Sequence, residues 1–194
     1  MTIEEIKNKL KNYTVGIAGA GGLGSNCAVA LARVGIGKLV VADFDVVSES
    51  NLNRQYFFRD QIGIKKVDAL KENINRINPE VKIEIHDIKL NEQNIVSLFK
   101  DCNIVVEAFD LAEMKKMLIE TCITQLPNIP IVIGSGMAGF GDNNSIKVRR
   151  IENLYICGDE KTEVSDKNPP LAPRVGIVAN MQANTVLEIL LEKK

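Results

Sequence analysis

The feature that most constrains the fold is a glycine-rich run near the start of the chain, G-A-G-G-L-G at residues 19–24. A short β-branched run precedes it at 13–19, and an Ala- and Leu-rich stretch of helical length follows it at 22–34. This order predicts a strand, a tight turn and a helix. Glycine suits such a turn because the backbone bends sharply and approaches its ligand closely, while the free N–H groups of the helix start can bind a phosphate.

The next strand completes a strand–helix–strand unit and ends on an acidic residue. Residues 39–42 form a continuous apolar run, typical of a strand buried on both faces of a parallel sheet. Asp43 follows, about 20 residues after the glycine loop, where a carboxylate can accept hydrogen bonds from ribose hydroxyls. Glycines that only allow close packing of a helix on a strand would not need this acid, so nucleotide binding is favoured, although NAD and ATP are not separated. The nucleotide-binding residues predicted here are Gly19, Gly21, Gly22, Gly24 and Asp43.

Strand and helix patterns continue to alternate along the chain. Helices are predicted at 60–78, 92–100 and 112–125, and strands at 81–87, 104–109 and 131–135. The pattern then changes to two short strands at 145–151 and 154–156, a polar, proline-bearing loop at 159–173 and a closing helix at 175–193. The expected fold is α/β: a Rossmann-like, doubly wound, mostly parallel sheet with a short irregular β region and a C-terminal helix. The whole chain, 1–194, is expected to form one domain.

Composition excludes several classes of function. The formal net charge of −1 provides no broad basic field, so binding to nucleic acid or to an anionic membrane surface is not expected. No apolar run approaches the length of a membrane span, and the charged N-terminus is expected to form a helix with a capping box at Thr2 and Glu5, not a signal peptide. The four cysteines contain no Cys-x-x-Cys pair, which favours reduced thiols in a cytoplasmic protein.

The segment after Asp43 favours chemistry on a triphosphate. Asp45, the run S-N-L-N-R-Q at 50–55 and the lysine Lys66 follow within a short stretch. Arg54 can clamp phosphate oxygens with two parallel bonds, and Lys66 can act as a compact charge on a neighbouring phosphate. A hydride-transfer site has no evident use for such cations beside carboxylates.

Two acidic residues are expected at the carboxyl edge of the sheet. Asp45 and Asp110 each end or follow a predicted parallel strand, so both should face the crevice in which ligands of such folds bind. Carboxylates there suit Mg²⁺, which commonly takes one or two protein carboxylates together with phosphate oxygens. The sequence therefore predicts a magnesium site at Asp110 and Asp45.

These motifs resemble the ThiF/MoeB/HesA family, the bacterial relatives of ubiquitin-activating enzymes. The resemblance covers nearly the whole chain. It rests on G-A-G-G-L-G at 19–24, D-F-D at 43–45, S-N-L-N-R-Q at 50–55, G-x-x-K at 63–66, R-I-N-P at 76–79, Asp110, and A-P-x-x-G with a later Q-A at 172–183.

The resemblance implies a function and a role for each site residue. ATP would bind the glycine loop, Asp43 would hold the ribose, Asn51, Arg54, Gln55 and Lys66 would contact phosphates, and Asp110 would position Mg²⁺. Arg54, Lys66 and Asp110 would be the catalytic set, acting through position and charge. The substrate would be the C-terminal Gly-Gly carboxylate of a ubiquitin-like sulfur carrier, by analogy of length a ThiS-like protein of thiamine biosynthesis. The family's two-fold dimers imply a homodimer.

The chain departs from the family pattern in three places. It lacks the two Cys-x-x-Cys pairs of longer relatives, so no zinc is expected; Leu111 stands where relatives often have asparagine; and its first arginine is Arg33, beyond the N-terminal helix. Cys157, expected at the edge of a mobile loop, is a candidate thiol to accept an acyl group from the adenylate. Three other functions stay open: an NAD-dependent oxidoreductase, a carrier-binding module without turnover, and activation of a carboxyl group on tRNA.

Overall fold

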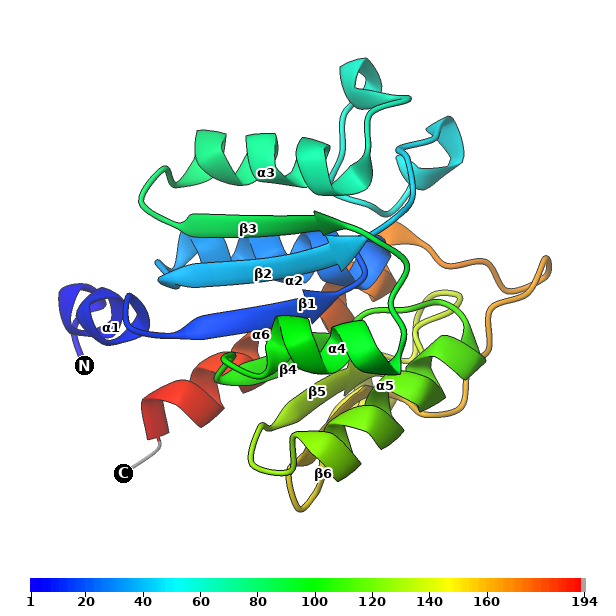
Figure 1. The fold of residues 1–194 in the computed structure, drawn as a ribbon. Coiled ribbons are helices and arrows are strands. Elements are labelled where there is room, and N and C mark those ends of the chain that lie inside the picture. The colour runs from blue at the N-terminus through cyan, green and yellow to red at the C-terminus, as the bar shows by residue number, and fades with distance from the viewer. Residues whose placement is uncertain (193–194) are drawn as a thin grey trace.

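A seven-stranded sheet forms the centre of the computed structural model, which describes residues 1–192 (Figure 1). The strands lie side by side in the order β3-β2-β1-β4-β5-β7-β6, all parallel to their neighbours except β6, which is antiparallel to β7. The strand order reverses between β1 and β4, where folds of this class bind ligands. The strands are β1 (Thr14–Ala18), β2 (Lys38–Asp43), β3 (Lys82–Asp87), β4 (Ile104–Glu107), β5 (Ile131–Gly134), β6 (Lys147–Ile151) and β7 (Leu154–Gly158).

Helices cover both faces of the sheet. α2, α3 and α6 share one apolar core cluster with one face, and α4 and α5 share a second cluster with the other. In Figure 1, α4 and α5 stand in front of the sheet, and α1 lies beyond the N-terminal end of β1. The helices are α1 (Ile3–Leu10), α2 (Gly22–Arg33), α3 (Lys66–Ile77), α4 (Glu92–Phe99), α5 (Ala112–Gln125) and α6 (Ala172–Glu192); the short 3₁₀ turns are η1 (Glu49–Asn51), η2 (Arg59–Gln61) and η3 (Asn143–Ser145).

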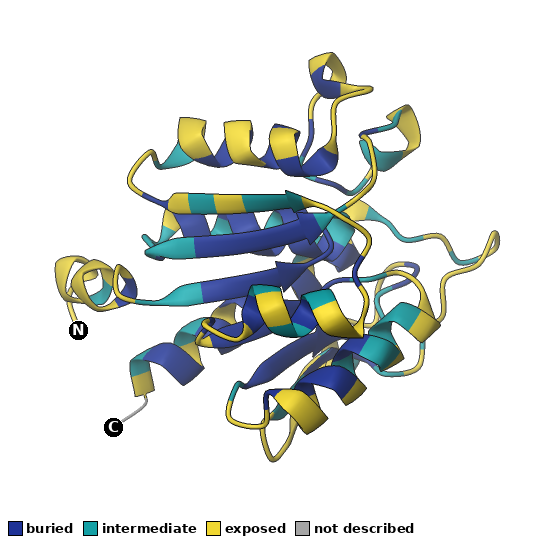
Figure 2. Cartoon of the chain, viewed as in Figure 1, coloured by how far each residue is buried: buried dark blue, intermediate teal, exposed yellow. Residues whose placement is uncertain are grey.

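Burial follows the sequence pattern. Every residue of β4 and β5 is buried, which the apolar runs at 104–106 and 131–133 favour in a sheet covered on both faces, and the buried set includes the charged Glu107 at the end of β4. Figure 2 shows this as dark blue central strands under helices whose outer faces are yellow. The two edge strands differ from the centre: β3 contains only exposed and half-buried residues, and every residue of β6 is exposed. The buried central strands therefore form a rigid base for the loops at their carboxyl ends.

The predicted fold class is confirmed, and most element boundaries agree within two residues. The capping box of α1 forms as expected, because Thr2 Oγ1 accepts a hydrogen bond from Glu5 N and Glu5 Oε2 accepts one from Thr2 N. The two short strands predicted as an irregular region join the main sheet as β6 and β7. The closing helix begins at Ala172, earlier than expected, with Pro173 in its first turn, where its missing N–H costs nothing. The predicted end of this helix at Lys193 lies outside the described residues.

The predicted start of the second crossover helix at residue 60 is wrong. Residues 59–61 form the turn η2, and Gly63 has a positive φ of 87° that a right-handed helix does not allow. The helix α3 begins only at Lys66. The apolar periodicity therefore identified the helix, while the glycine set where it starts.

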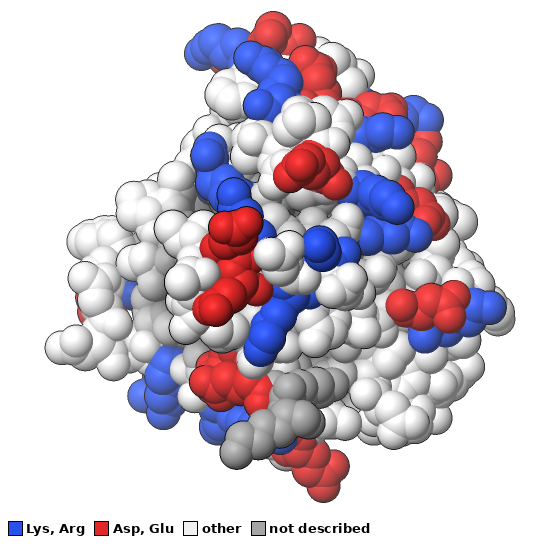
Figure 3. Space-filling model, turned by 90° about the vertical axis from the view of Figure 1, so that its left-hand side faces the viewer, with Lys and Arg blue, Asp and Glu red and all other residues white. Residues whose placement is uncertain are grey.

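One face of the molecule carries charges of both signs (Figure 3). Figure 3 shows the side on which α1 lies, and there Lys and Arg alternate with Asp and Glu without a wide region of one sign. Within residues 1–192, no helix combines the length and the hydrophobicity that crossing a bilayer requires.

Candidate functional site

The glycine loop joins β1 to α2 and packs tightly on the end of β4. Gly19 has a φ of 99°, and a Cβ on it would lie 2.9 Å from the carbonyl oxygen of Ala108. A Cβ on Gly24 would lie 1.8 Å from the carbonyl oxygen of Gly19. Neither position accepts a side chain without backbone movement, so both glycines are needed for this turn.

Asp43 connects the loop to the segment that follows β2. Its Oδ2 accepts a hydrogen bond of 2.6 Å from Ala20 N, and its Oδ1 accepts one of 2.8 Å from Asp45 N. A carboxylate has about four acceptor positions, so Asp43 keeps capacity for a ligand hydroxyl. The carboxyl end of β2 is thereby fixed next to the glycine loop.

The segment around η1 lies against the first half of α2. The Asn26 side chain donates to Arg54 O at 2.9 Å, and Tyr56 N donates to Ser25 Oγ at 2.9 Å. The aliphatic part of Arg54 passes the loop, with its Cγ 3.5 Å from the position of a Cβ on Gly22. Arg54 is therefore held beside the glycines by contacts that the sequence motif alone did not reveal.

The Arg54 guanidinium and the Asn51 amide both have protein partners. Arg54 Nη1 donates to Ser50 O at 3.2 Å and to Asn53 Oδ1 at 2.8 Å. Asn51 Oδ1 accepts from Ser48 N at 3.1 Å and so helps to cap η1. Arg54 still has donors for phosphate oxygens, whereas part of the hydrogen-bonding capacity of Asn51 is used in the turn.

Gln55 carries an unpartnered polar atom beside the glycine loop. The residue is 9% exposed, and its buried Oε1 has no hydrogen-bond partner. Its Nε2 lies 3.8 Å from the position of a Cβ on Gly21. A buried carbonyl oxygen without a donor costs about 1–3 kcal/mol, so this atom fits a site that is completed by a ligand or by water.

Lys66 and Asp45 form an ion pair at the start of α3. Lys66 Nζ lies 2.7 Å from Asp45 Oδ2, and Lys66 N donates to Asp45 O at 2.9 Å. The Lys66 side chain is 7% exposed, while the Asp45 side chain is 50% exposed. The Lys66 ammonium is therefore held in place by Asp45, while the Asp45 carboxylate remains accessible from solvent.

Asp110 is exposed just beyond β4, and a buried acid that sequence reasoning missed lies before it. Glu107 ends β4 with no exposed surface; its carboxylate pairs with Lys115 and accepts from Phe109 N at 2.7 Å. Burial raises the pKa of Glu107, and Lys115 opposes this shift. A glutamate inside the apolar run I-V-V-E was the available signal. Through its bond from Phe109 N, Glu107 contacts the turn that leads to Asp110.

The contacts gather most of the predicted residues around one loop. Gly22 lies against Arg54, Gly21 faces Gln55, and Ala20 binds Asp43. The chain then leads from Asp43 through Asp45 to Lys66, while Asp110 follows the end of β4 on which Gly19 packs. Cationic and acidic side chains thus share the carboxyl edge of the parallel strands.

Cys157 lies one residue before the end of β7, next to the loop as expected, but its side chain is buried there. It lies within β7 with no exposed surface, and its Sγ lies 3.7 Å from Thr185 Oγ1 of α6. Burial raises the pKa of this thiol to about 11. A buried, protonated thiol is a poor nucleophile, so its surroundings do not favour the acyl-accepting role predicted for it. Cys27 and Cys122 are buried in helices, as predicted.

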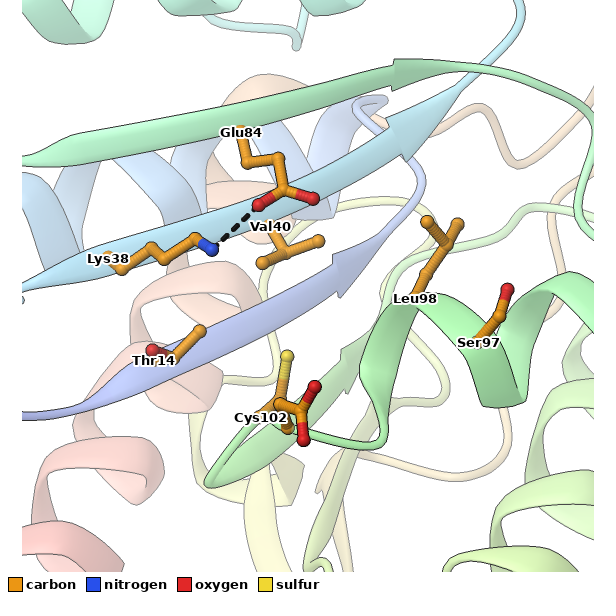
Figure 4. A pocket seen from close by; sticks show the side chains of 8 residues that line it. Thr14, Lys38, Val40, Glu84, Ser97, Leu98 and Cys102 are labelled. Carbon is orange, nitrogen blue, oxygen red and sulfur yellow. Dashed lines mark ion pairs between the residues drawn. The ribbon is translucent and has the colours of Figure 1, made fainter.

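Two cavities lie away from the glycine loop. One of about 170 Å³ is lined from β1, β2, β3 and α4, and Figure 4 shows Lys38 reaching across to Glu84 at its wall. A second, of about 480 Å³, lies between β6, β7 and the end of α6. Neither brings together the residues predicted to act on a nucleotide.

The two carboxylates predicted to hold Mg²⁺ differ in how free they are to bind an ion. Within residues 1–192, no group of three or more His, Cys, Asp and Glu side chains is arranged to hold a metal ion. Asp110 offers an exposed carboxylate, whereas the carboxylate of Asp45 is already paired with Lys66. One protein carboxylate completed by phosphate oxygens and water is a normal arrangement for Mg²⁺.

Comparison with known sequences gives consistent matches over nearly the whole chain. Residues 2–194 match the family described as the ThiF family. The chain is 32% identical to adenylyltransferase and sulfurtransferase MOCS3 of Caenorhabditis briggsae, over 94% of this chain and 47% of that protein. It is 29% identical to the molybdopterin-synthase adenylyltransferase of Salmonella typhimurium, over 96% of this chain and 76% of that protein. The chain thus spans about half the length of the MOCS3 relative.

Solved structures show the same fold. The E. coli tRNA N6-threonylcarbamoyladenosine dehydratase TcdA in complex with ATP superposes with a TM-score of 0.88 at 23% identity, over 98% of this chain and 90% of that chain. E. coli MccB with succinimide superposes with a TM-score of 0.74 at 23% identity, over 95% of this chain and 58% of that chain. At these identities the likeness establishes the architecture.

Proposed function

The chain belongs to the ThiF family, and from this premise we propose that it adenylates the C-terminal carboxylate of a ubiquitin-like carrier protein, using ATP and releasing pyrophosphate. Relatives that match nearly the whole chain are named adenylyltransferases. The finer proposal is that the carrier is a ThiS-like sulfur carrier with a Gly-Gly terminus, that the enzyme serves thiamine biosynthesis in the cytoplasm, and that it works as a homodimer.

One observation carries this proposal. Arg54 packs beside Gly22. The buried Lys66 ammonium pairs with Asp45, whose backbone N–H donates to Asp43, and Asp43 in turn accepts from the glycine loop. Both cations therefore lie at the carboxyl edge of the sheet. The backbone N–H groups of such a loop can bind a phosphate, and two cations lie beside it. This combination suits a triphosphate more than a nicotinamide dinucleotide. The unpartnered Gln55 Oε1 could accept from a hydroxyl or amino group of the nucleotide, whereas contact with a phosphate would have to come from the donor Nε2 of the same side chain.

The chemistry requires charge management more than proton transfer. An oxygen of the carrier carboxylate bonds to the α-phosphorus, and the bond from that phosphorus to the oxygen bridging to the β-phosphate breaks. Negative charge accumulates on the departing pyrophosphate, where Arg54 and Lys66 would stabilise it. Asp43 would orient the ribose and so place the α-phosphorus toward the entering carboxylate.

The metal has a limited role in this proposal. Asp110 would hold Mg²⁺, with Asp45 as a second carboxylate if Lys66 moves to the phosphates. When bound, the ion neutralises phosphate charge and thereby assists departure of pyrophosphate. The protein residues supply position and the remaining positive charge.

The test is carrier-dependent exchange of radiolabelled pyrophosphate into ATP. We expect exchange with a ThiS-like carrier and Mg²⁺, and loss of exchange when the carrier's terminal Gly-Gly is removed. Arg54→Ala should slow exchange by about 10²–10⁴-fold, equivalent to roughly 3–5 kcal/mol of transition-state stabilisation. Arg59→Ala is the matched control, since Arg59 is an exposed arginine of the neighbouring turn η2.

The alternatives give different results in the same assay. Exchange with other ubiquitin-like carriers but not with a ThiS-like one would reject the thiamine assignment alone. Carrier binding that ignores ATP, with no exchange, would support a binding module. Tighter calorimetric binding of NAD than of ATP would support an oxidoreductase.

A further inference from the structure

Arg174 is a buried cation in the first turn of α6, and the predicted chemistry gives it no role. It is 3% exposed. A positive charge at a helix N-terminus opposes the helix dipole, and the first turn of α6 contains no acidic residue to compensate. An arginine in such a place needs partners from elsewhere in the fold.

Those partners come from two other segments. Arg174 Nη2 donates to Asp159 Oδ2 at 2.6 Å, and Asp159 is 5% exposed at the exit of β7. Arg174 Nη1 donates to the carbonyl oxygen of Gly141, in the loop before η3, and Nη2 approaches Ser145 Oγ at 3.4 Å. One guanidinium therefore joins the start of α6, the end of β7 and the loop after β5.

The carboxylate side of this pair is held as firmly as the guanidinium side. Asp159 Oδ1 accepts from the backbone N–H groups of Lys161 and Thr162, each at 2.8 Å. A Cβ on Gly136, whose φ is 77°, would lie 1.9 Å from the same oxygen. The ion pair is thus built into closely packed backbone and is not a pair of freely rotating side chains.

The next residue of α6 lies beside the glycine loop. Val175 Cγ1 lies 3.0 Å from the position of a Cβ on Gly22, the same position that Arg54 Cγ approaches at 3.5 Å. The segment just before α6 also reaches the motif around η1, because the Asn53 side chain donates to Pro170 O at 3.5 Å. A displacement of the first turn of α6 would therefore reach both Gly22 and Arg54.

We propose that Arg174 is a positioning residue for the nucleotide site, which fixes the start of α6 through Asp159 and Gly141 so that Val175 supports the glycine loop and Arg54. This inference rests on the proposed function for its catalytic consequence. Its structural part, the rigidity of the loop, does not depend on which reaction the site performs.

The test compares Arg174→Met, which removes the buried ion pair, with a control variant that removes a neighbouring exposed ion pair. Arg149 pairs with Glu160, the residue after Asp159, but does so from the exposed strand β6, so Arg149→Met is the control. Arg174→Lys keeps the charge without the fork that reaches Asp159 and Gly141 together. Two readouts are needed: hydrogen exchange of the amides of residues 19–25, and kcat/KM for pyrophosphate exchange below the unfolding temperature.

Arg174→Met should accelerate amide exchange in the glycine loop and lower kcat/KM by about 10- to 100-fold, as expected when a supporting contact is misplaced. Arg174→Lys should lie between this variant and the wild type, and Arg149→Met should stay within about twofold of the wild type. If Arg174→Met lowers Tm yet matches Arg149→Met in both readouts, the proposal is overturned.

The outcomes separate the two proposals. If the wild type shows no pyrophosphate exchange with any carrier, the proposed function fails, and hydrogen exchange alone decides whether Arg174 positions the loop. If Arg174→Met does not fold, Arg174→Lys decides: wild-type values in both readouts would reject the role, and an intermediate effect would support it.

Discussion

At the scale of single residues, the site depends on glycines that have no side chain as much as on its charged residues. Gly24 has no space for a methyl group because the carbonyl of Gly19 occupies it. The sequence motif identified both glycines, since close backbone approach is the reason for the pattern. The motif could not show that Gln55 keeps an unpartnered oxygen, because that depends on packing between segments distant in the sequence.

Replacing Gly24 with alanine should destabilise the protein and abolish nucleotide binding. The Cβ would have to displace backbone, and we expect a loss of about 1–3 kcal/mol in the free energy of unfolding. Gly176→Ala is the control, because Gly176 lies within α6 with no atom within 4 Å of an added Cβ. That variant should gain up to about 1 kcal/mol. Urea unfolding measures both, and equal effects would contradict the packing argument.

Replacing Lys66 with methionine should weaken ATP binding. A charge-assisted hydrogen bond contributes about 1.5–3 kcal/mol, so the Kd should rise roughly 10- to 100-fold. Lys65→Met is a close control, since Lys65 is the preceding residue and pairs with Asp87 at the surface. Isothermal calorimetry with ATP distinguishes the two. A similar small change in both variants would remove Lys66 from the phosphate site.

At the scale of elements, local pattern and long-range pairing differ in how well sequence predicts them. The strands β2 and β4 and the helix α5 follow directly from their apolar patterns. The pairing of β7 with β5 has no local signal, because it joins segments separated by the loop and turn that precede β6. This pairing also buries Cys157 beneath α6, so the burial of that thiol could not be predicted from local sequence either.

The ion pair between Arg174 and Asp159 predicts how stability depends on acid. Burial alone would raise the pKa of Asp159, but the backbone N–H groups of Thr162 and Lys161 together with Arg174 lower it from 3.8 to about 2. A carboxyl with a depressed folded-state pKa contributes stability that is fully present above its unfolded pKa and is lost as the pH falls toward the folded value. The relevant window is therefore about pH 4 to 2.

Urea unfolding at a series of pH values checks this expectation. Asp159→Asn should be less stable than the wild type at neutral pH and should lose less stability on acidification below pH 4. Asp166→Asn, which removes an exposed carboxylate from the same loop, should keep the wild-type slope. Equal slopes in all three proteins would show that Asp159 does not carry the acid dependence.

At the scale of the whole molecule, the four cysteines report on global opening. All four are buried, and burial raises the pKa of Cys102 to about 12 and those of Cys122 and Cys157 to about 11. We expect a neutral thiol reagent to label them only at the rate at which the protein opens. Labelling that follows urea unfolding would confirm this. Rapid labelling of Cys157 in the native protein would instead support its role as an acyl acceptor. If Cys157 has no such role, Cys157→Ser should leave pyrophosphate exchange unchanged.

The exposed flank of the sheet has a consequence for the molecule as it is synthesised and stored. A bare strand edge can recruit identical strands from other molecules, and β6 presents such an edge along its full length. Three of its five residues are basic, and although Arg149 is paired with Glu160, Lys147 and Arg150 still place positive charge on the strand, so a second copy approaching in line would meet repulsion. We therefore expect these charges to disfavour strand-to-strand association at this edge.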